Sequence, residues 1–460
     1  MGRGTSHDLE VARGLESLAA ADAGAALEAF DAARAMAPDD ARVALLAAEA
    51  ARATGICASA RFADALSLAP GDGAAAIGLA EALLAEENPV AADALIAAWL
   101  DRTPSWIEGQ AWLAKQRFMA GEADYARALD RALMADRENV ALWQARIALD
   151  FHGDRYAAAL DRIEAAERAT GRHPRWTAQR AAALDECGNP EAAAALYATL
   201  DPAVDVGLAV RIARHHLRRG STGEALVACE PWLGTTRSEV VWPYIALAWR
   251  VAGDPRWEWL EGQPGLIGVY DVPLDAITME TLAVTTRALH HTIRQPIDQS
   301  LRGGTQTAGQ LLARAEPAYR GLRAALTEVV AAHCAGLPPR DPFHPTLRHR
   351  RDAGVRFAGS WSVRLVDGGH HVAHVHSQGW LSSAFYLALP DPQAGASADS
   401  GWLALGEPGT ELELDLTPLR LIEPRLGRLV LFPSTMWHAT RPFGRGERLT
   451  IAFDVAPPDG

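Results

Sequence analysis

The stretch HVHSQGWLSSAFYLALP, residues 374–390, places two histidines directly before a run rich in apolar residues. Residues 380–390 have the composition and the two-residue alternation of a β-strand. His374 and His376 stand two positions apart, so on an extended chain both side chains point to the same face. The stretch therefore predicts a strand preceded by a pair of histidines that share one face of a sheet.

Further short strands are expected on both sides of this stretch, separated by Gly, Pro and Asp turns without an intervening helix. They lie at residues 355–366, 401–405, 419–424, 427–433 and 447–455. Many short strands joined by turns are typical of an antiparallel jelly roll or barrel. We therefore expect the C-terminal part of the chain to be an all-β domain.

A third histidine and an arginine return to the same region from distant strands. His438 follows the predicted strand 427–433, and Arg448 opens the last strand with Thr450 on the same face. Three facially placed ligands with open positions for an oxo-acid and dioxygen are what a mononuclear non-haem iron site requires. A guanidinium presents a fork of donors that matches a carboxylate. We expect His374, His376 and His438 to bind a metal ion and Arg448 to bind an acid beside it.

The N-terminal half has a different character, because it is rich in Ala and helical in period up to about residue 255. A Gly, once an Asn, recurs at 31- to 35-residue spacings between amphipathic stretches, at Gly24, Gly55, Asn88, Gly121, Gly153, Gly188, Gly220 and Gly253. Left-handed backbone geometry at a helix end suits Gly and Asn best. The period resembles that of the tetratricopeptide repeat, whose helix–turn–helix units stack into a solenoid with a concave groove. A plain scaffold and a groove that binds a peptide or a protein partner both remain open.

The segment 256–350 connects the two halves. Helical periodicity continues through residues 277–293 and 316–337, and the polar segment 295–312 lies between them. Gly303 and Gly304 break any helix there. The segment is either a simple connection or a lid over a substrate, and the candidate substrate contacts are Arg302, Thr305, Gln306 and, from the later strand, Trp380.

The overall composition limits the possible partners. The 460 residues carry 44 basic against 57 acidic groups, a formal net charge of −13. A phosphate backbone needs clustered cations, so nucleic acid is not expected as a partner. No apolar run approaches the length that spans a bilayer, and residues 1–10 are polar. We therefore expect a cytoplasmic protein that has no membrane segment.

The C-terminal motifs resemble the 2-oxoglutarate/Fe(II)-dependent oxygenases, and within them a bacterial and phage group often fused to tetratricopeptide repeats. The resemblance rests on residues 374–390, on GRLVLFPSTMWHATRP (427–442) and on ERLTIAFDV (447–455). It implies a multidomain α + β protein. Its parts would be an all-α tetratricopeptide-like solenoid (8–255), a helical bridge that belongs to the catalytic domain (256–350) and a double-stranded β-helix, or jelly roll, with flanking helices (351–460).

The same resemblance implies roles for individual residues. His374 and His438 would be iron ligands, and Arg448 with Thr450 would bind the far carboxylate of 2-oxoglutarate. Weaker candidates for that pocket are Tyr386, Ser362 and Arg364. His376 departs from the family, which at large has Asp or Glu at this position. Whether His376, a water molecule or Asp367 completes the iron site stays open.

The resemblance implies an enzyme with Fe(II), 2-oxoglutarate and dioxygen. It would hydroxylate a peptide or protein side chain recruited by the repeats, since a fused solenoid suits a large substrate. Two alternatives remain open. One is a cupin-like three-histidine metalloprotein that does not use 2-oxoglutarate, and the other is a catalytically inactive tetratricopeptide adaptor.

Overall fold

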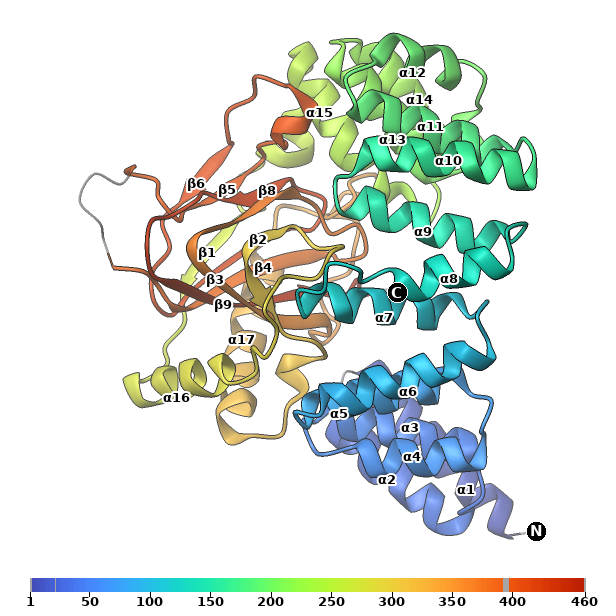
Figure 1. Ribbon diagram of the computed structural model, residues 1–460. Coiled ribbons are helices and arrows are strands. Elements are labelled where there is room, and N and C mark those ends of the chain that lie inside the picture. The colour runs from blue at the N-terminus through green and yellow to red at the C-terminus, as the bar shows by residue number, and fades with distance from the viewer. Residues whose placement is uncertain (1, 21, 392–396, 459–460) are drawn as a thin grey trace.

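The computed structural model describes residues 2–20, 22–391 and 397–458, and side chains from residue 6 onward. Helices fill the N-terminal half and lie along one side of a C-terminal β-domain (Figure 1). These helices are α1 (Gly2–Ala19), α2 (Ala23–Met36), α3 (Ala41–Ala53), α4 (Ser59–Leu68), α5 (Gly73–Ala85), α6 (Pro89–Arg102), α7 (Ile107–Met119), α8 (Arg127–Ala135), α9 (Val140–His152), α10 (Tyr156–Thr170), α11 (Pro174–Glu186), α12 (Pro190–Tyr197), α13 (Val206–Arg218), α14 (Thr222–Cys229) and α15 (Trp242–Ala252).

Short polar side chains start many of these helices. The side chains of Asp40, Asp72, Asn139 and Asp205 each accept a hydrogen bond from a backbone N–H two or three residues further on. Such caps satisfy amide groups that have no partner within the helix. The helices are therefore delimited by local sequence, and Ala-rich faces let successive helices pack closely.

The predicted left-handed turns occur at most of the recurring glycines. Gly55, Gly121, Gly188, Gly220 and Gly253 have φ between 67° and 82°. In two other turns the positive φ falls on a neighbour of the recurring residue, at Glu87 (φ 59°) and Asp154 (φ 55°), whereas Gly24 lies inside α2. The repeat period thus sets the place of each turn, and the local chain decides which residue adopts the strained geometry.

The C-terminal sheet is antiparallel and contains all six strands expected from the sequence. Among the described residues it has nine strands in the order β1-β7-β4-β9-β3-β8-β5-β6, with β2 paired to β3. The strands are β1 (Gly268–Asp271), β2 (Leu301–Gln306), β3 (Phe357–His374), β4 (Leu381–Ala388), β5 (Leu403–Leu405), β6 (Arg420–Ile422), β7 (Arg428–Pro433), β8 (His438–Thr440) and β9 (Glu447–Val455). The predicted multidomain architecture, a helical solenoid followed by a jelly roll, is confirmed.

The polar segment 295–312 differs from the expectation of a loop between helices. Leu301–Gln306 is strand β2, which pairs with β3 through a bulge between Arg302 and Gly304. A Cβ on Gly304 would lie 2.3 Å from the backbone oxygen of Arg364, so the two strands approach too closely for any larger residue. The two glycines therefore serve a β-bulge, which a helix-breaking signal alone does not distinguish from a loop.

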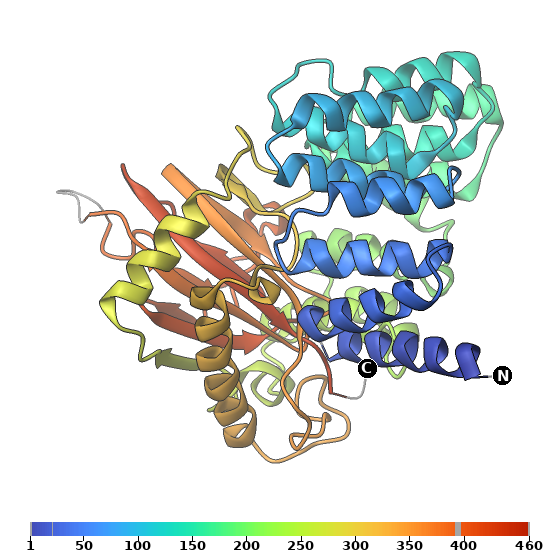
Figure 2. The same cartoon turned by 90° about the horizontal axis from the view of Figure 1, so that it is seen from below.

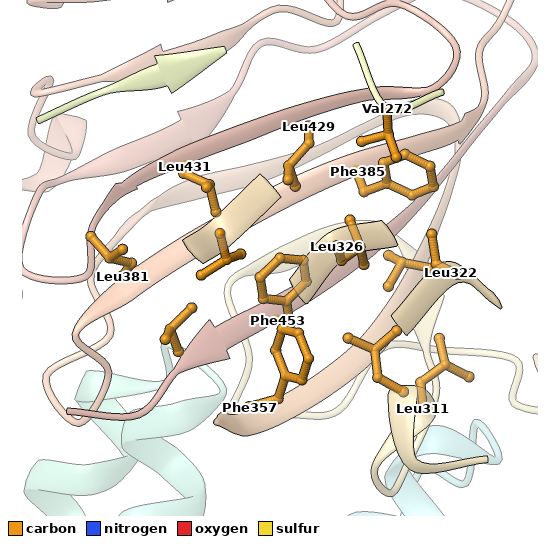
Figure 3. Packing of buried hydrophobic residues seen from close by; sticks show 14 of the residues in the cluster. Val272, Leu311, Leu322, Leu326, Phe357, Leu381, Phe385, Leu429, Leu431 and Phe453 are labelled. Atoms are coloured by element: carbon orange, nitrogen blue, oxygen red, sulfur yellow. The ribbon is translucent and has the colours of Figure 1, made fainter. Parts of the chain in front are cut away.

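One face of the sheet is covered by helices. The helix α17 (Pro317–Gly336) packs Leu322 and Leu326 against Phe385 of β4 and Phe453 of β9, as Figure 3 shows. The helix α16 (Ala276–Arg287) lies beside it (Figure 2). Leu449 and Ile451 of β9 belong to the same core. Because side chains alternate along a strand, Arg448 and Thr450 lie on the opposite face.

The end of the solenoid packs directly against the β-domain. The core around α13 and α15 includes Trp437, and Ala373 and Val375 pack against it. In the middle of the solenoid, Lys115 pairs with Asp298 at 3.0 Å and the backbone oxygen of Met119 accepts hydrogen bonds from the amides of residues 293 and 294.

Among the described residues, none of the helices combines the length and the apolar character needed to cross a membrane.

Candidate metal centre

Three histidines meet on the face of the sheet that the helices leave free. His374 ends β3, His376 follows it, and His438 begins β8, where its backbone pairs with that of His374. One ring nitrogen from each lies within 4.8 Å of the other two. The ring centroids of His374 and His438 are 4.1 Å apart. The predicted trio therefore converges on one point.

Hydrogen bonds orient each of these rings. The Nδ1 atom of His374 lies 2.9 Å from the carbonyl oxygen of Val372, and that of His438 lies 3.0 Å from the carbonyl oxygen of Met436. A carbonyl oxygen only accepts, so each Nδ1 carries the proton and each Nε2 has a free lone pair. Burial lowers the pKa of His374 to about 3, and burial holds the pKa of His438 well below its usual value. Both imidazoles are thus neutral at pH 7, as metal ligands must be.

His376 has a different partner, which the sequence analysis missed. Its Nδ1 lies 2.8 Å and 3.0 Å from the two carboxylate oxygens of Asp454, near the end of β9. The hydroxyl of Ser382 on β4 donates to Asp454 at 2.7 Å. Asp454 stands in the quoted motif ERLTIAFDV, and its place on the same face as Arg448 and Thr450 is the signal that would have found it.

Arg448 is buried on the same face of β9 as Asp454, with 2% of its surface exposed. Its Nη1 donates to the hydroxyl of Thr440 at 3.2 Å, and its guanidinium lies 5.0 Å from the ring centroid of Tyr386. The Nε of Arg448 and the hydroxyl of Tyr386 are both buried without a hydrogen-bond partner in the described part of the chain. A buried cation with unused donors fits an anionic ligand such as a carboxylate.

Arg448 does not form a surface ion pair with its neighbour Glu447. Its neighbour Glu447 instead pairs with Arg287 and Arg364 on the helix-covered face, at 2.8 and 2.6 Å. Arg448 faces inward because it is one residue out of phase with Glu447.

A fourth histidine lies between the trio and Arg448. The ring of His371 stacks on that of His374 at 5.6 Å, and its Nδ1 is 3.1 Å from the hydroxyl of Ser300. In the β3–β8 register His371 pairs with Thr440, which holds Arg448. Burial keeps the pKa of His371 well below its usual value. His371 therefore lies between the cluster of His374, His376 and His438 and the side chain of Arg448.

Three further residues were predicted to bind the acid beside Arg448, and the structure places them on two different faces of the sheet. Thr450 is buried beside Arg448 on its face, across from Tyr386. Ser362 and Arg364 pair with Ile451 and Leu449, so they lie on the helix-covered face. There the Ser362 hydroxyl lies 3.1 Å from His290 Nε2, and Arg364 binds Glu447. The structure does not bring Ser362 and Arg364 to Arg448.

The candidate substrate contacts lie in several different places. Arg302 reaches Asp154 of the solenoid at 3.4 Å, and the Thr305 hydroxyl contacts His290 at 2.8 Å. Gln306 ends β2 opposite Val363, which pairs with Thr450, so Gln306 lies on the same face of the sheet as Thr450 and Arg448. Trp380 is a core residue whose indole donates to the backbone oxygen of Thr346.

Asp367 does not complete the histidine cluster. It is exposed at a bend of β3, where its φ is 38° and its carboxylate accepts a hydrogen bond from the amide of Gly446. The group of potential ligands among the described residues consists of His374, His376 and His438.

The residues of this centre fit the iron and the 2-oxoglutarate that the sequence resemblance implies. Three neutral imidazoles with free lone pairs are suited to iron and other divalent transition metals. The unpaired donors of Arg448 and Tyr386 suit a carboxylate on the same side of the sheet. The arrangement can hold a metal ion and a dicarboxylic acid side by side.

Comparisons with known proteins agree with this chemistry. Residues 359–454 match the family described as "Putative 2OG-Fe(II) oxygenase". A PKHD-type hydroxylase from Gluconacetobacter diazotrophicus is 34% identical over 119 residues, and the match spans 26% of this chain and 45% of that relative's length. Among solved structures, a tetratricopeptide repeat protein from Parabacteroides merdae has 14% identity and a TM-score of 0.34, with 53% of this chain and 99% of that chain covered. A prolyl-4-hydroxylase from Pseudomonas putida has 20% identity and a TM-score of 0.30, with 42% and 92% covered.

The likeness to both solved structures is weak, whereas the sequence match covers the motifs described above. The match includes the three histidines, Arg448 and Asp454. The chain therefore combines an N-terminal array of helical repeats with a C-terminal region, residues 359–454, that matches the 2OG-Fe(II) oxygenase family.

Proposed function

We propose that this protein is an Fe(II)- and 2-oxoglutarate-dependent oxygenase that hydroxylates a peptide or protein side chain. The observation that carries the proposal is the pairing of a three-imidazole cluster with a buried arginine that has an unused donor on the same face of the sheet. A structural role for the arginine would call for a carboxylate partner, and none of the described residues supplies one.

The chain's own residues have distinct tasks. His374, His376 and His438 would hold the iron, and Arg448 would bind the far carboxylate of 2-oxoglutarate through its planar fork. Tyr386 and Thr450 would line that pocket. The bound iron, with 2-oxoglutarate and dioxygen, supplies the oxidation of a substrate C–H bond with release of succinate and carbon dioxide.

The burial of the pocket supports this assignment of tasks. Arg448 and Tyr386 are 2% and 0% exposed, so an acid bound there would be shielded from water. Charge-assisted hydrogen bonds are stronger in such an environment than at the surface. The pocket thereby favours a ligand that carries a negative charge at the end far from the metal.

A large substrate is supported by the architecture. The solenoid lies along the β-domain (Figure 2) and contacts it near both its middle and its C-terminal end. A repeat surface held rigidly beside a catalytic centre raises the effective concentration of any segment that it binds. We infer that the repeats recruit a protein or peptide, of which one side chain reaches the metal centre.

Two alternatives make different predictions. A cupin-like three-histidine protein would bind metal but would have no use for the unpaired donors of Arg448. An inactive adaptor would have no reason to keep the three imidazoles oriented by separate hydrogen bonds. Both are outcomes of the test described next.

The test is to load the full-length protein with Fe(II) under argon, add 2-oxoglutarate and oxygen, and measure succinate with and without a peptide library. We expect slow succinate formation that peptides accelerate, and none in His438→Ala, which should also fail to bind iron. Iron binding without turnover of 2-oxoglutarate would favour the hypothesis of a cupin-like three-histidine metalloprotein. A parent protein that binds no iron would favour the adaptor.

A further inference from the structure

We propose that Asp454 is a positioning residue that supplies, through His376, the negative charge that the oxygenase family at large places directly on the metal. The inference rests on the proposed function, because it assigns His376 to the metal. It concerns the one position of the triad at which this chain departs from the His-x-Asp/Glu pattern. The carboxylate is still present, but it lies behind the imidazole.

The contacts single out His376 among the three histidines. His374 and His438 each donate from Nδ1 to a neutral carbonyl oxygen two residues earlier in the chain. His376 instead meets both oxygens of Asp454, at 2.8 and 3.0 Å. A carboxylate keeps the proton on Nδ1, directs the Nε2 lone pair toward the cluster and raises the basicity of that nitrogen. His376 would therefore be the strongest electron donor of the three ligands.

A network of hydrogen bonds holds the carboxylate of Asp454 in place. The Ser382 hydroxyl donates to Asp454 Oδ1 at 2.7 Å and lies 2.9 Å from the Ser434 hydroxyl. Ser382 is the cross-strand partner of Asp454 in the β4–β9 register, so the sheet itself fixes this contact. The network thus joins β4, β9 and Ser434, the residue that follows β7, behind a single imidazole.

Close packing around the network excludes larger side chains. A Cβ on Gly379 would lie 2.5 Å from the Ser434 Oγ and 3.2 Å from the Asp454 Cβ. On the other side, the ring of Trp361 lies 5.6 Å from that of His376. The Asp454 side chain is 16% exposed, so solvent screens its charge only partly. The space behind His376 is therefore shaped for this carboxylate.

The matched test uses Asp454→Asn, which preserves the side-chain shape and an accepting oxygen but removes the charge. The full-length protein is titrated with Co(II), whose visible absorption reports binding without turnover. Removing an acidic partner of a metal-bound histidine typically costs 10- to 100-fold in metal affinity, and we expect a loss of roughly this size. The control is Asp271→Asn, since Asp271 is an exposed residue of the same domain paired with Arg428, and it should bind Co(II) like the parent.

A second pair of variants separates charge from structure. His376→Asp puts a carboxylate directly on the metal, beside Asp454, so the two negative charges repel one another. We therefore expect His376→Asp to bind Co(II) more tightly when it is combined with Asp454→Asn than alone. A purely structural Asp454 would lower the affinity by the same factor in both backgrounds, and that result would overturn the inference.

A third measurement needs no variant and no metal. In the metal-free parent, at a pH where His376 is neutral, nitrogen NMR should show its proton on Nδ1, and the tautomer with a proton on Nε2 alone would contradict the inference even if Asp454→Asn failed to fold. If the parent and the Asp454→Asn variant bind Co(II) with equal affinity, this inference is overturned and the proposed function still stands. A parent that binds neither Co(II) nor Fe(II) would overturn both.

Discussion

The indole Nε1–H of Trp437 donates to the backbone oxygen of Pro243, 3.1 Å away, although 194 residues separate the two in the chain. Trp437 immediately precedes the candidate ligand His438, and Pro243 lies in the first turn of α15 at the end of the solenoid. The Trp437 ring also meets Tyr244 edge to face at 5.6 Å. The last repeat thereby holds the backbone segment that carries the candidate metal ligand His438.

Trp437→Phe should weaken this connection while it keeps most of the packing. Loss of one buried hydrogen bond costs about 1 kcal/mol, and we expect the free energy of unfolding to fall by that amount. Co(II) affinity should fall as well, because His438 is less firmly placed. Denaturation and Co(II) titration measure the two effects. Trp99→Phe, on a distant repeat, should not alter Co(II) affinity, and a similar loss there would contradict the argument.

A protein shortened to residues 256–460 should lose the metal centre. The truncation uncovers Trp437, Ala373 and Val375, all of which pack against the core around α13 and α15. Ala373 and Val375 alternate with His374 and His376, so their apolar cover also fixes the ligand segment. Size-exclusion chromatography followed by Co(II) titration checks this expectation. A monomeric fragment that binds Co(II) like the full chain would show that the repeats are dispensable for the site.

Arg448→Lys should lower the affinity for 2-oxoglutarate and leave metal binding unchanged. Lysine keeps the charge but loses the planar fork, at a cost of about 1.5–3 kcal/mol, or roughly one to two decades in affinity. Calorimetric titration of the Co(II)-loaded protein with 2-oxoglutarate measures the difference. Arg428→Lys is the matched control, because Arg428 opens β7 and pairs with the exposed Asp271. Equal affinities of parent and Arg448→Lys would remove Arg448 from the pocket.

Glu261 should make stability depend on pH. It is buried in the π-helical turn Glu258–Gly262, and burial raises its pKa from 4.5 to about 7, against the opposing effect of Arg250. The folded state therefore favours the protonated acid, and this contribution to stability is full below pH 4.5 and is lost as pH rises through 7. Glu261→Gln should melt higher than the parent at pH 8, with the difference shrinking toward pH 5. A difference that does not change with pH would contradict the assignment.

The strand pattern of the C-terminal part was largely readable from the sequence. Strands such as β4, β7 and β9 appear where apolar alternation and turn residues place them, since both signals are local. Three strands were not predicted, namely the short β1 and β8 and the glycine-containing β2, because none has enough alternating residues to distinguish it from a turn or loop. The histidine trio was also accessible, since its members lie in order within recognisable motifs.

By itself, the sequence determined the periods: a repeat of about 33 residues in the first half, alternating strands in the second, and histidines at positions that a jelly roll brings together. Only the tertiary structure decided which polar residues share a face with them. Asp454 reaches His376, while Ser362 and Arg364 turn toward the helices, because cross-strand register assigns each side chain to one face. Register depends on pairing between residues far apart in the chain, so no local pattern specifies it. The contact between Trp437 and Pro243 arises in the same way, from the packing of two domains rather than from any local motif.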